Sequence, residues 1–223
     1  MQRLPEPELM DDPAQARAYA HADFEDAHSA IVAHFRRVFE KHEAPHTMLD
    51  LGCGPADISI RFARLYPDCK IDAVDGAHFM LEQARTFTER AGLHHQITLH
   101  LQRLPDCELP EKCYQAIVSN SLLHHLHEPQ DLWTTIRKYA SPDTAIFICD
   151  LYRPQTLEQA EGLVSRYAAD EPEILRRDFY NSLLAAFTPD EVEAQLSTAG
   201  LRGLKLEPIS DRHLLVHGSI QGA

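Results

Sequence analysis

One stretch of the chain predicts its fold: Met48-Leu49-Asp50-Leu51-Gly52-Cys53-Gly54-Pro55-Ala56. A buried strand over residues 47–51 runs into two closely spaced glycines, and a helical pattern then continues until Pro67. Because glycine has no Cβ, such a loop lets a ligand approach the backbone closely. The stretch therefore predicts a strand, a ligand-binding loop and a helix.

The alternation of strand and helix continues on the C-terminal side of this unit. Strands are expected at residues 70–74, 97–101, 116–119 and 145–149, and helices at 77–91 and 128–139. Strands that alternate with helices of this length indicate a doubly wound α/β fold with a parallel sheet.

The pattern changes after Asp150, where two helical stretches, 156–169 and 172–186, follow each other without a strand. Thr188-Pro189-Asp190-Glu191 is typical of a capping box that starts a helix, which we expect to end at Gly200. Two last strands, 201–208 and 213–219, are joined by a turn so short that they must be antiparallel. These features predict one domain with a helical insertion.

The N-terminal part, residues 1–41, does not follow the alternation of strands and helices. Residues 1–13 are acidic and contain three prolines, so we expect a loose tail. Residues 14–41 form a helical pattern with an apolar stripe at Ile31, Val32, Phe35, Val38 and Phe39.

Composition excludes several classes of protein. The chain has 223 residues and a net charge of −13, which argues against a general nucleic-acid binder. No apolar run approaches the roughly 18 residues of a membrane span, and the N-terminus does not resemble a signal peptide. Five cysteines without a C-x-x-C pair favour a reducing cytoplasm. The oligomeric state stays open between monomer and homodimer.

Two acidic positions indicate the ligand of the loop. A dinucleotide fingerprint would need a third glycine at position 57, but Asp57 stands there, and its charge would repel a pyrophosphate. Asp75 ends the second strand, where a carboxylate can accept both hydroxyls of a ribose. An adenosine with a cationic amino-acid tail, S-adenosylmethionine, satisfies both observations.

At this point the motifs resemble those of class I S-adenosylmethionine-dependent methyltransferases. Residues 48–56 look like the glycine-rich first motif, 74–81 like the second, and 114–126 like the fourth-strand motif. The resemblance implies a Rossmann-like sheet of seven strands, six parallel and the last antiparallel. It also implies a helical lid (1–43), a cofactor-binding core (44–150), a helical cap (151–187), and a final helix with a closing hairpin (188–223).

The resemblance also implies the residues that contact the cofactor. In the family the acid of the second motif takes the ribose, the methionine packs on the adenine, and the N-terminal segment often closes over the cofactor. Carried over to this chain, the set is Asp50, Gly52, Cys53, Gly54, Asp75, Gly76, Met80, Gln102, Arg103, Leu104, Asn120 and Tyr19. The chain departs from the family at Gln102-Arg103-Leu104, where an acidic residue usually meets the adenine amino group.

The remaining site residues concern the acceptor. His124 or His125 could act as general base. We expect no metal, because neighbouring side chains on a helix point about 100° apart. Aromatic and cationic residues after the fifth strand suggest a small, carboxylate-bearing acceptor held by Tyr152, Arg153, Phe179, Tyr180 and Arg212. Ordinary ion pairing, such as Arg153 with Asp150, would explain these arginines equally well. A protein or tRNA methyltransferase, a non-catalytic cofactor-binding protein and a nucleotide-dependent dehydrogenase remain alternatives.

Overall fold

The computed structural model describes residues 1–220. A central sheet of seven strands has the order β3-β2-β1-β4-β5-β7-β6. Its strands are β1 (Thr47–Leu51), β2 (Lys70–Asp75), β3 (Ile97–Leu101), β4 (Tyr114–Asn120), β5 (Ala140–Leu151), β6 (Lys205–Pro208) and β7 (His213–Gly218). β7 pairs antiparallel with both β5 and β6, whereas the other pairs are parallel. The predicted fold class and the antiparallel last strand are confirmed.

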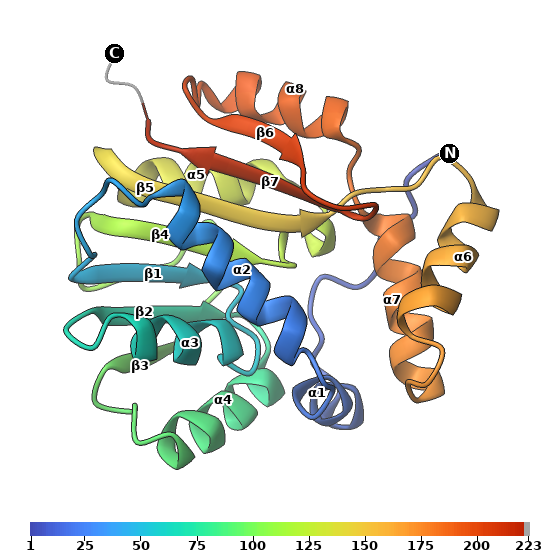
Figure 1. Ribbon diagram of the computed structural model, residues 1–223, viewed down its shortest axis with the longest axis horizontal. Helices are drawn as coiled ribbons and strands as arrows, with labels where there is room; N and C mark the ends of the chain where they lie inside the picture. Colours follow the sequence, from blue (N-terminus) through green and yellow to red (C-terminus); the bar gives the residue numbers. More distant parts are fainter. Residues whose placement is uncertain (221–223) are drawn as a thin grey trace.

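Helices cover both faces of this sheet (Figure 1). They are α1 (Pro13–Ala20), α2 (Glu25–Val38), α3 (Asp57–Leu65), α4 (His78–Arg90), α5 (Gln130–Tyr139), α6 (Leu157–Tyr167), α7 (Glu173–Ala185) and α8 (Pro189–Ala199), with a 3₁₀ turn, η1 (Leu123–His125). One core cluster joins α2, α3 and α4 to the sheet through residues such as Phe35 and Phe62, and a second joins α5 and α8 through residues such as Trp133 and Leu196. Burying both faces explains why the central strands are nearly continuous apolar runs.

The helical insertion after β5 is present as predicted, with α6 and α7 in place of the two expected helical stretches. They stand beyond the carboxyl ends of β1 and β5, apart from the layers that cover the sheet (Figure 1). The capping box of Thr188 and Glu191 begins α8, and Gly200 ends it with φ +67°. The cap is therefore placed at the end of the sheet where ligands bind in this type of fold.

Two expectations for the N-terminal part are wrong. The helical pattern of residues 14–41 is interrupted at residues 21–24, so α1 and α2 are separate helices. Residues 1–12, hereafter the N-terminal segment, are an extended stretch without regular secondary structure that is bound to the rest of the protein, and not a loose tail. The Leu4 N–H donates to Leu184 O (3.0 Å), and the Arg3 side chain donates to Ala185 O. Contacts with α7 and η1 fix this segment in spite of its polar composition.

All five cysteines are free, and four of them are buried. Within residues 1–220 no helix combines the length and the apolar character needed to cross a membrane.

Candidate active site

A cavity of about 790 Å³ lies at the carboxyl ends of the parallel strands. The loops after β1, β2, β3 and β4 line one part of it, and α7, α6 and the turn before β7 line the other. This position follows from the topology, since β1 and β4 are adjacent while the chain proceeds from β1 outward to β2 and β3. The cavity therefore joins the predicted cofactor loops to the cap.

The glycine loop after β1 has the backbone that the sequence motif requires. Gly52 has φ +71°, and a Cβ at this position would lie 2.8 Å from the side chain of Leu122. Gly54 has φ +52°, and nothing lies within 4 Å of where its Cβ would be. Asp75 Oδ2 accepts a hydrogen bond from the Gly54 N–H, and Oδ1 accepts one from the Ala77 N–H, both at 2.8 Å. The end of β2 thus holds the loop open beside the cavity, and these residues fit an adenosine ligand.

Burial changes the protonation of this loop. It raises the pKa of Asp50 to about 7, against the effect of the hydrogen bond that Ser59 Oγ donates to the carboxylate. Burial, followed by the neighbouring carboxylates Asp75 and Asp50, also raises the pKa of the Cys53 thiol well above its ordinary value. Cys53 is therefore a small apolar group in the loop and not a reactive thiolate.

All seven of the other predicted cofactor residues also line the cavity. These are Gly76, Met80, Gln102, Arg103, Leu104, Asn120 and Tyr19. The amide of Gln102, however, exchanges two hydrogen bonds with the backbone of Glu108, so its side chain is occupied within its own loop. Tyr19 of α1 is partly buried, and removal of its hydroxyl from water raises the pKa of that hydroxyl to about 12.

The charge of Asp57, taken from the sequence as a repulsive one, is compensated in the structure. Its Oδ2 pairs with Arg61 Nε (2.7 Å) and His28 Nδ1 (2.6 Å), and Arg61 in turn pairs with Glu25 (2.8 Å). Burial acts to raise the pKa of Asp57, but His28 and Arg61 outweigh it and lower the value. Asp57 therefore links α3 to α2 through ion pairs. The absence of a glycine at position 57 could not predict this role.

The acceptor residues predicted from the sequence divide into two groups. Phe179 and Arg212 line the cavity. Tyr152, Arg153 and Tyr180 are not among its lining residues: Tyr152 pairs with Phe187 in a short bridge, and Tyr180 packs against the interior of the cap. The guanidinium carbon of Arg212 lies over the ring of Tyr167 (3.4 Å to its centroid), and Arg212 pairs with Asp211 Oδ1 (3.0 Å).

Arg153 is the clearest correction on this side. Its guanidinium is 5% exposed, donates to Ala186 O (2.7 Å) and pairs with Glu191 Oε1 (2.7 Å). Ion pairing thus explains this arginine, although its partner is Glu191 and not the Asp150 suggested by the sequence. Arg153 links the end of β5 to the start of α8.

The N-terminal segment contributes groups that the sequence analysis missed. Arg3 donates to the backbone carbonyls of Ala185, His124 and Leu126, and its guanidinium stacks on Phe187 (3.9 Å). Glu6 accepts a hydrogen bond from Ser182 Oγ of α7 (2.9 Å). These contacts join residues more than 120 positions apart, so no local pattern could have predicted them.

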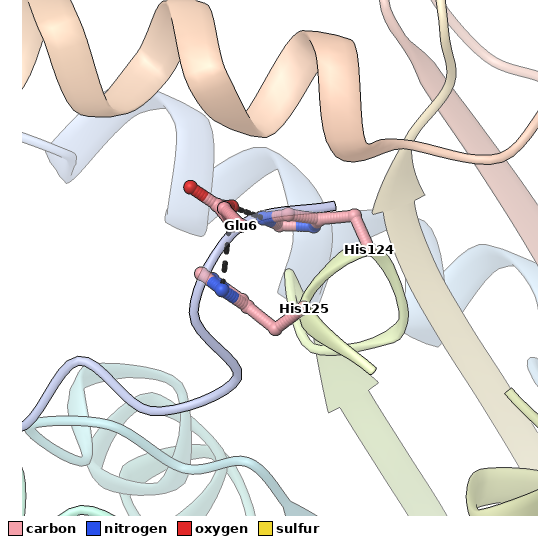
Figure 2. A group of neighbouring side chains, drawn as sticks. All are labelled: Glu6, His124 and His125. Atoms are coloured by element: carbon pink, nitrogen blue, oxygen red, sulfur yellow. Dashed lines mark ion pairs between the residues drawn. The ribbon is translucent and has the colours of Figure 1, made fainter. Parts of the chain in front are cut away.

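The two histidines of η1 do not point apart, and the geometric reason for excluding a metal is wrong. In the tight 3₁₀ turn their ring centroids are 4.2 Å apart and their planes are tilted by 35°. Both rings face the carboxylate of Glu6 (Figure 2). His124 also pairs through Nδ1 with Asp150 Oδ1 (2.6 Å).

The protonation of the two histidines differs. Burial disfavours the charged form of His124, but Asp150 and then Glu6 outweigh it and raise its pKa. Burial lowers the pKa of His125 well below its ordinary value, and His124 adds to this effect. Burial raises the pKa of Glu6.

Residues 48–143 match the family model described as "Methyltransferase domain". The matched residues, which are less than half of the chain, form a class I S-adenosylmethionine-dependent methyltransferase domain, and the predicted family, enzyme class and cofactor are confirmed to that extent.

Among curated relatives, the chain is 28% identical over 171 residues to a malonyl-[acyl-carrier protein] O-methyltransferase of Geobacter sulfurreducens. The match covers 76% of this chain, and the chain spans only 60% of that relative's length. Among solved structures, it is similar in fold to a SAM-dependent methyltransferase of Aquifex aeolicus, with a TM-score of 0.71, 17% identity and coverage of 94% and 98% of the two chains. It is also similar to the plantazolicin methyltransferase BpumL, solved in complex with a triazolic desmethylPZN analog and SAH (S-adenosylhomocysteine), with a TM-score of 0.66, 15% identity and coverage of 93% and 92%.

Proposed function

We propose that the protein transfers the methyl group of S-adenosylmethionine to a carboxylate oxygen of a small, partly apolar molecule. The continuous cavity is the observation that carries this proposal, because it places the cofactor loops and the cap around one space. The bound cofactor supplies an electrophilic methyl group on a sulfonium. The chain then has to hold the acceptor oxygen in line with that methyl group and to exclude water.

The cap supports a small acceptor. A cavity of about 790 Å³ is within the usual range of small-molecule pockets and has to hold the cofactor as well. Leu175 and Phe179 of α7 supply apolar lining at the cap. The net charge of −13 makes a tRNA acceptor unfavourable.

A cation on the lining supports a carboxylate. Arg212 packs over the ring of Tyr167 and uses Nη1 for Asp211, which leaves other guanidinium donors for a carboxylate. The relatives named as malonyl-[acyl-carrier protein] O-methyltransferases favour the same chemistry, because the free oxygen nucleophile of a malonyl thioester is a carboxylate. A carboxylate is already ionised at neutral pH, so this reaction needs no general base. The base role of His124 or His125, the cytoplasmic location and the choice between monomer and homodimer stay predictions.

Matched pairs of acceptors test the proposal. The purified chain would be incubated with methyl-labelled S-adenosylmethionine and with aliphatic or aromatic acids, malonate or malonyl thioesters, each next to its own methyl ester. We expect labelled methyl ester from at least one free acid and none from its ester. Comparing malonate with malonyl thioesters shows whether the acceptor is a free acid or an acid bound to a carrier as a thioester. Methylation confined to amines, hydroxyls or macromolecules would contradict the proposal.

A further inference from the structure

Three side chains from two distant parts of the chain meet next to α7 of the cap. Glu6 comes from the N-terminal segment, and His124 and His125 come from η1 (Figure 2). Glu6 Oε1 lies 3.7 Å from His124 Nε2 and 3.3 Å from His125 Nδ1, and all three atoms lie within 4.8 Å of one another. The side chains are only 12%, 3% and 15% exposed, respectively.

These spacings suit a shared metal ion. Two ligand atoms bonded to zinc at about 2.1 Å lie about 3.4 Å apart at the tetrahedral angle. The two nitrogen–oxygen distances of 3.3 and 3.7 Å are close to that separation. An ion could therefore bind between these atoms with only small movements of the side chains.

The hydrogen bonds around the cluster leave the required atoms available. Asp150 occupies Nδ1 of His124, which is how carboxylates orient metal-binding histidines so that Nε2 faces the ion. His125 Nδ1 is buried, and no hydrogen bond to it is found among residues 1–220. Ser182 Oγ of α7 donates to Glu6 Oε1, the oxygen that faces both histidines, and the second lone pair of this oxygen remains for an ion. A buried nitrogen without a partner is costly unless something else satisfies it.

We propose that Glu6, His124 and His125 form a binding site for one divalent transition-metal ion of the zinc type. Two imidazole nitrogens and one carboxylate oxygen are the donor set of catalytic zinc sites that keep a fourth position open. His124 and His125 also line the cavity, so the fourth position is available to an oxygen of the acceptor. This last point rests on the proposed function, whereas metal binding does not.

Such an ion would also neutralise an acceptor carboxylate in an acidic protein. Of the arginines considered above, Arg153 is bound to Glu191 and Ala186, and Arg3 is bound to three carbonyls. Arg212, in the turn before β7, lines the cavity, and Asp211 already shares its charge. A metal at the cluster would add a second positive group on the side of the cavity formed by η1.

Metal titration of the full chain tests the site. After treatment with a chelator, the protein would be titrated with Zn²⁺ alone by calorimetry and with Co²⁺ alone by visible absorption. We expect one ion per chain and the intense visible bands of tetrahedral Co²⁺. All titrations use the double variant His94→Gln/His95→Gln as the background protein, into which the further substitutions are introduced. This variant lacks an exposed pair of neighbouring histidines that could bind metal on the surface.

Variants assign the ion to the cluster. Glu6→Gln and His125→Gln should each weaken Zn²⁺ binding at least 30-fold and abolish the tetrahedral Co²⁺ bands. Glu8→Gln is the matched control: Glu8 belongs to the same segment and contacts His127, but it lies outside the cluster, so binding should be unchanged. Circular dichroism checks that each variant is folded, and His125→Gln removes no hydrogen bond of the Nδ1 atom.

Absence of one-to-one binding by the background protein, or full affinity in folded Glu6→Gln and His125→Gln, would overturn the site. The titrations contain neither cofactor nor acceptor, so they are independent of the proposed function. A chain that binds Zn²⁺ at the cluster but methylates no carboxylate would overturn only the proposed reaction and the role of the fourth position.

Discussion

Two regions of different origin line the cavity: the loops after β1 and β2, and the N-terminal segment with the cap. In the first region Gly54 and Asp75 are 21 positions apart and are bound to each other at the ends of neighbouring strands. In the second, Arg3 is 182 positions from the carbonyl of Ala185 to which it donates. The sheet fixes the first region, whereas individual side-chain contacts fix the second. Substitutions should therefore affect cofactor and acceptor separately.

The largest effect should come from filling the glycine loop. Gly54→Ala places a Cβ in the open space beside the loop, where the cofactor has to approach the backbone, and we expect the Kd for S-adenosylmethionine to rise at least 100-fold in calorimetry. Gly92→Ala is the matched control, because Gly92 also has positive φ (+70°) and open space around its Cβ, but it ends α4 outside the cavity. Both variants pay a left-handed strain of about 1–2 kcal/mol. An equal Kd in both variants would place the cofactor elsewhere.

Asp75→Ala should have the next largest effect. The variant loses the proposed acceptor of the ribose hydroxyls as well as the hydrogen bonds from the Gly54 and Ala77 N–H groups. Losing hydrogen bonds to a charged group costs about 1.5–3 kcal/mol, so the Kd should rise roughly 10- to 100-fold. A folded Asp75→Ala variant with the Kd of the unchanged protein would exclude Asp75 as the ribose ligand.

The contrast between the regions also shows what the sequence could predict. The alternation of strands and helices, the cap after β5 and the capping box of α8 follow from local periodicity and short motifs, and they are confirmed. The ordered N-terminal segment could not be predicted, because its contacts with α7 and η1 are long-range. The histidines were misjudged because the angle between neighbouring Cα–Cβ bonds was used, and this angle is about 120° in a 3₁₀ turn such as η1. The side-chain torsions nevertheless bring both rings to Glu6.

Charged residues were the least predictable. Arg153 and Arg212 follow strands that end at the same edge of the sheet, and both could equally well have lined the cavity. Only the position of Glu191, 38 residues from Arg153, decides that Arg153 is buried in an ion pair. Residue type and strand position therefore predicted which arginines lie near the site but not which of them face it.

Arg212→Met tests the acceptor side and should lower kcat/KM for the acceptor about 10-fold, at the lower end of the loss of a hydrogen bond to a charged group. Arg166→Met is the control: Arg166 also pairs with Asp211 and approaches the ring of Tyr167, but it is 68% exposed and outside the cavity lining. The Kd for the cofactor should stay within about threefold in both variants, since neither residue belongs to the cofactor loops. Equal kinetics of the two variants would remove Arg212 from the acceptor site.

The smallest effect is the pH dependence of cofactor binding, which concerns the buried Asp50 of the first region. Because burial raises its pKa to about 7, the free protein is mostly protonated at this residue at pH 6 and half ionised at pH 7. A cofactor with a sulfonium and an ammonium group should bind the ionised form better. Its affinity should therefore rise about fivefold from pH 6 to pH 7, a range that ends below the pKa of an α-amino group.

Asp50→Asn provides the reference for this measurement, because its affinity should be nearly independent of pH over the same range. The same shift has the opposite consequence for folding. Between about pH 4 and pH 7 the folded state binds more protons at Asp50 than the unfolded state does, so the stability contributed by this residue falls as pH rises. The difference in free energy of unfolding between the unchanged protein and Asp50→Asn should follow that trend in denaturant titrations at pH 5, 6 and 7. If cofactor affinity of the unchanged protein is flat over this range while that stability difference changes as expected, Asp50 titrates in the free fold but does not contact the cationic part of the cofactor.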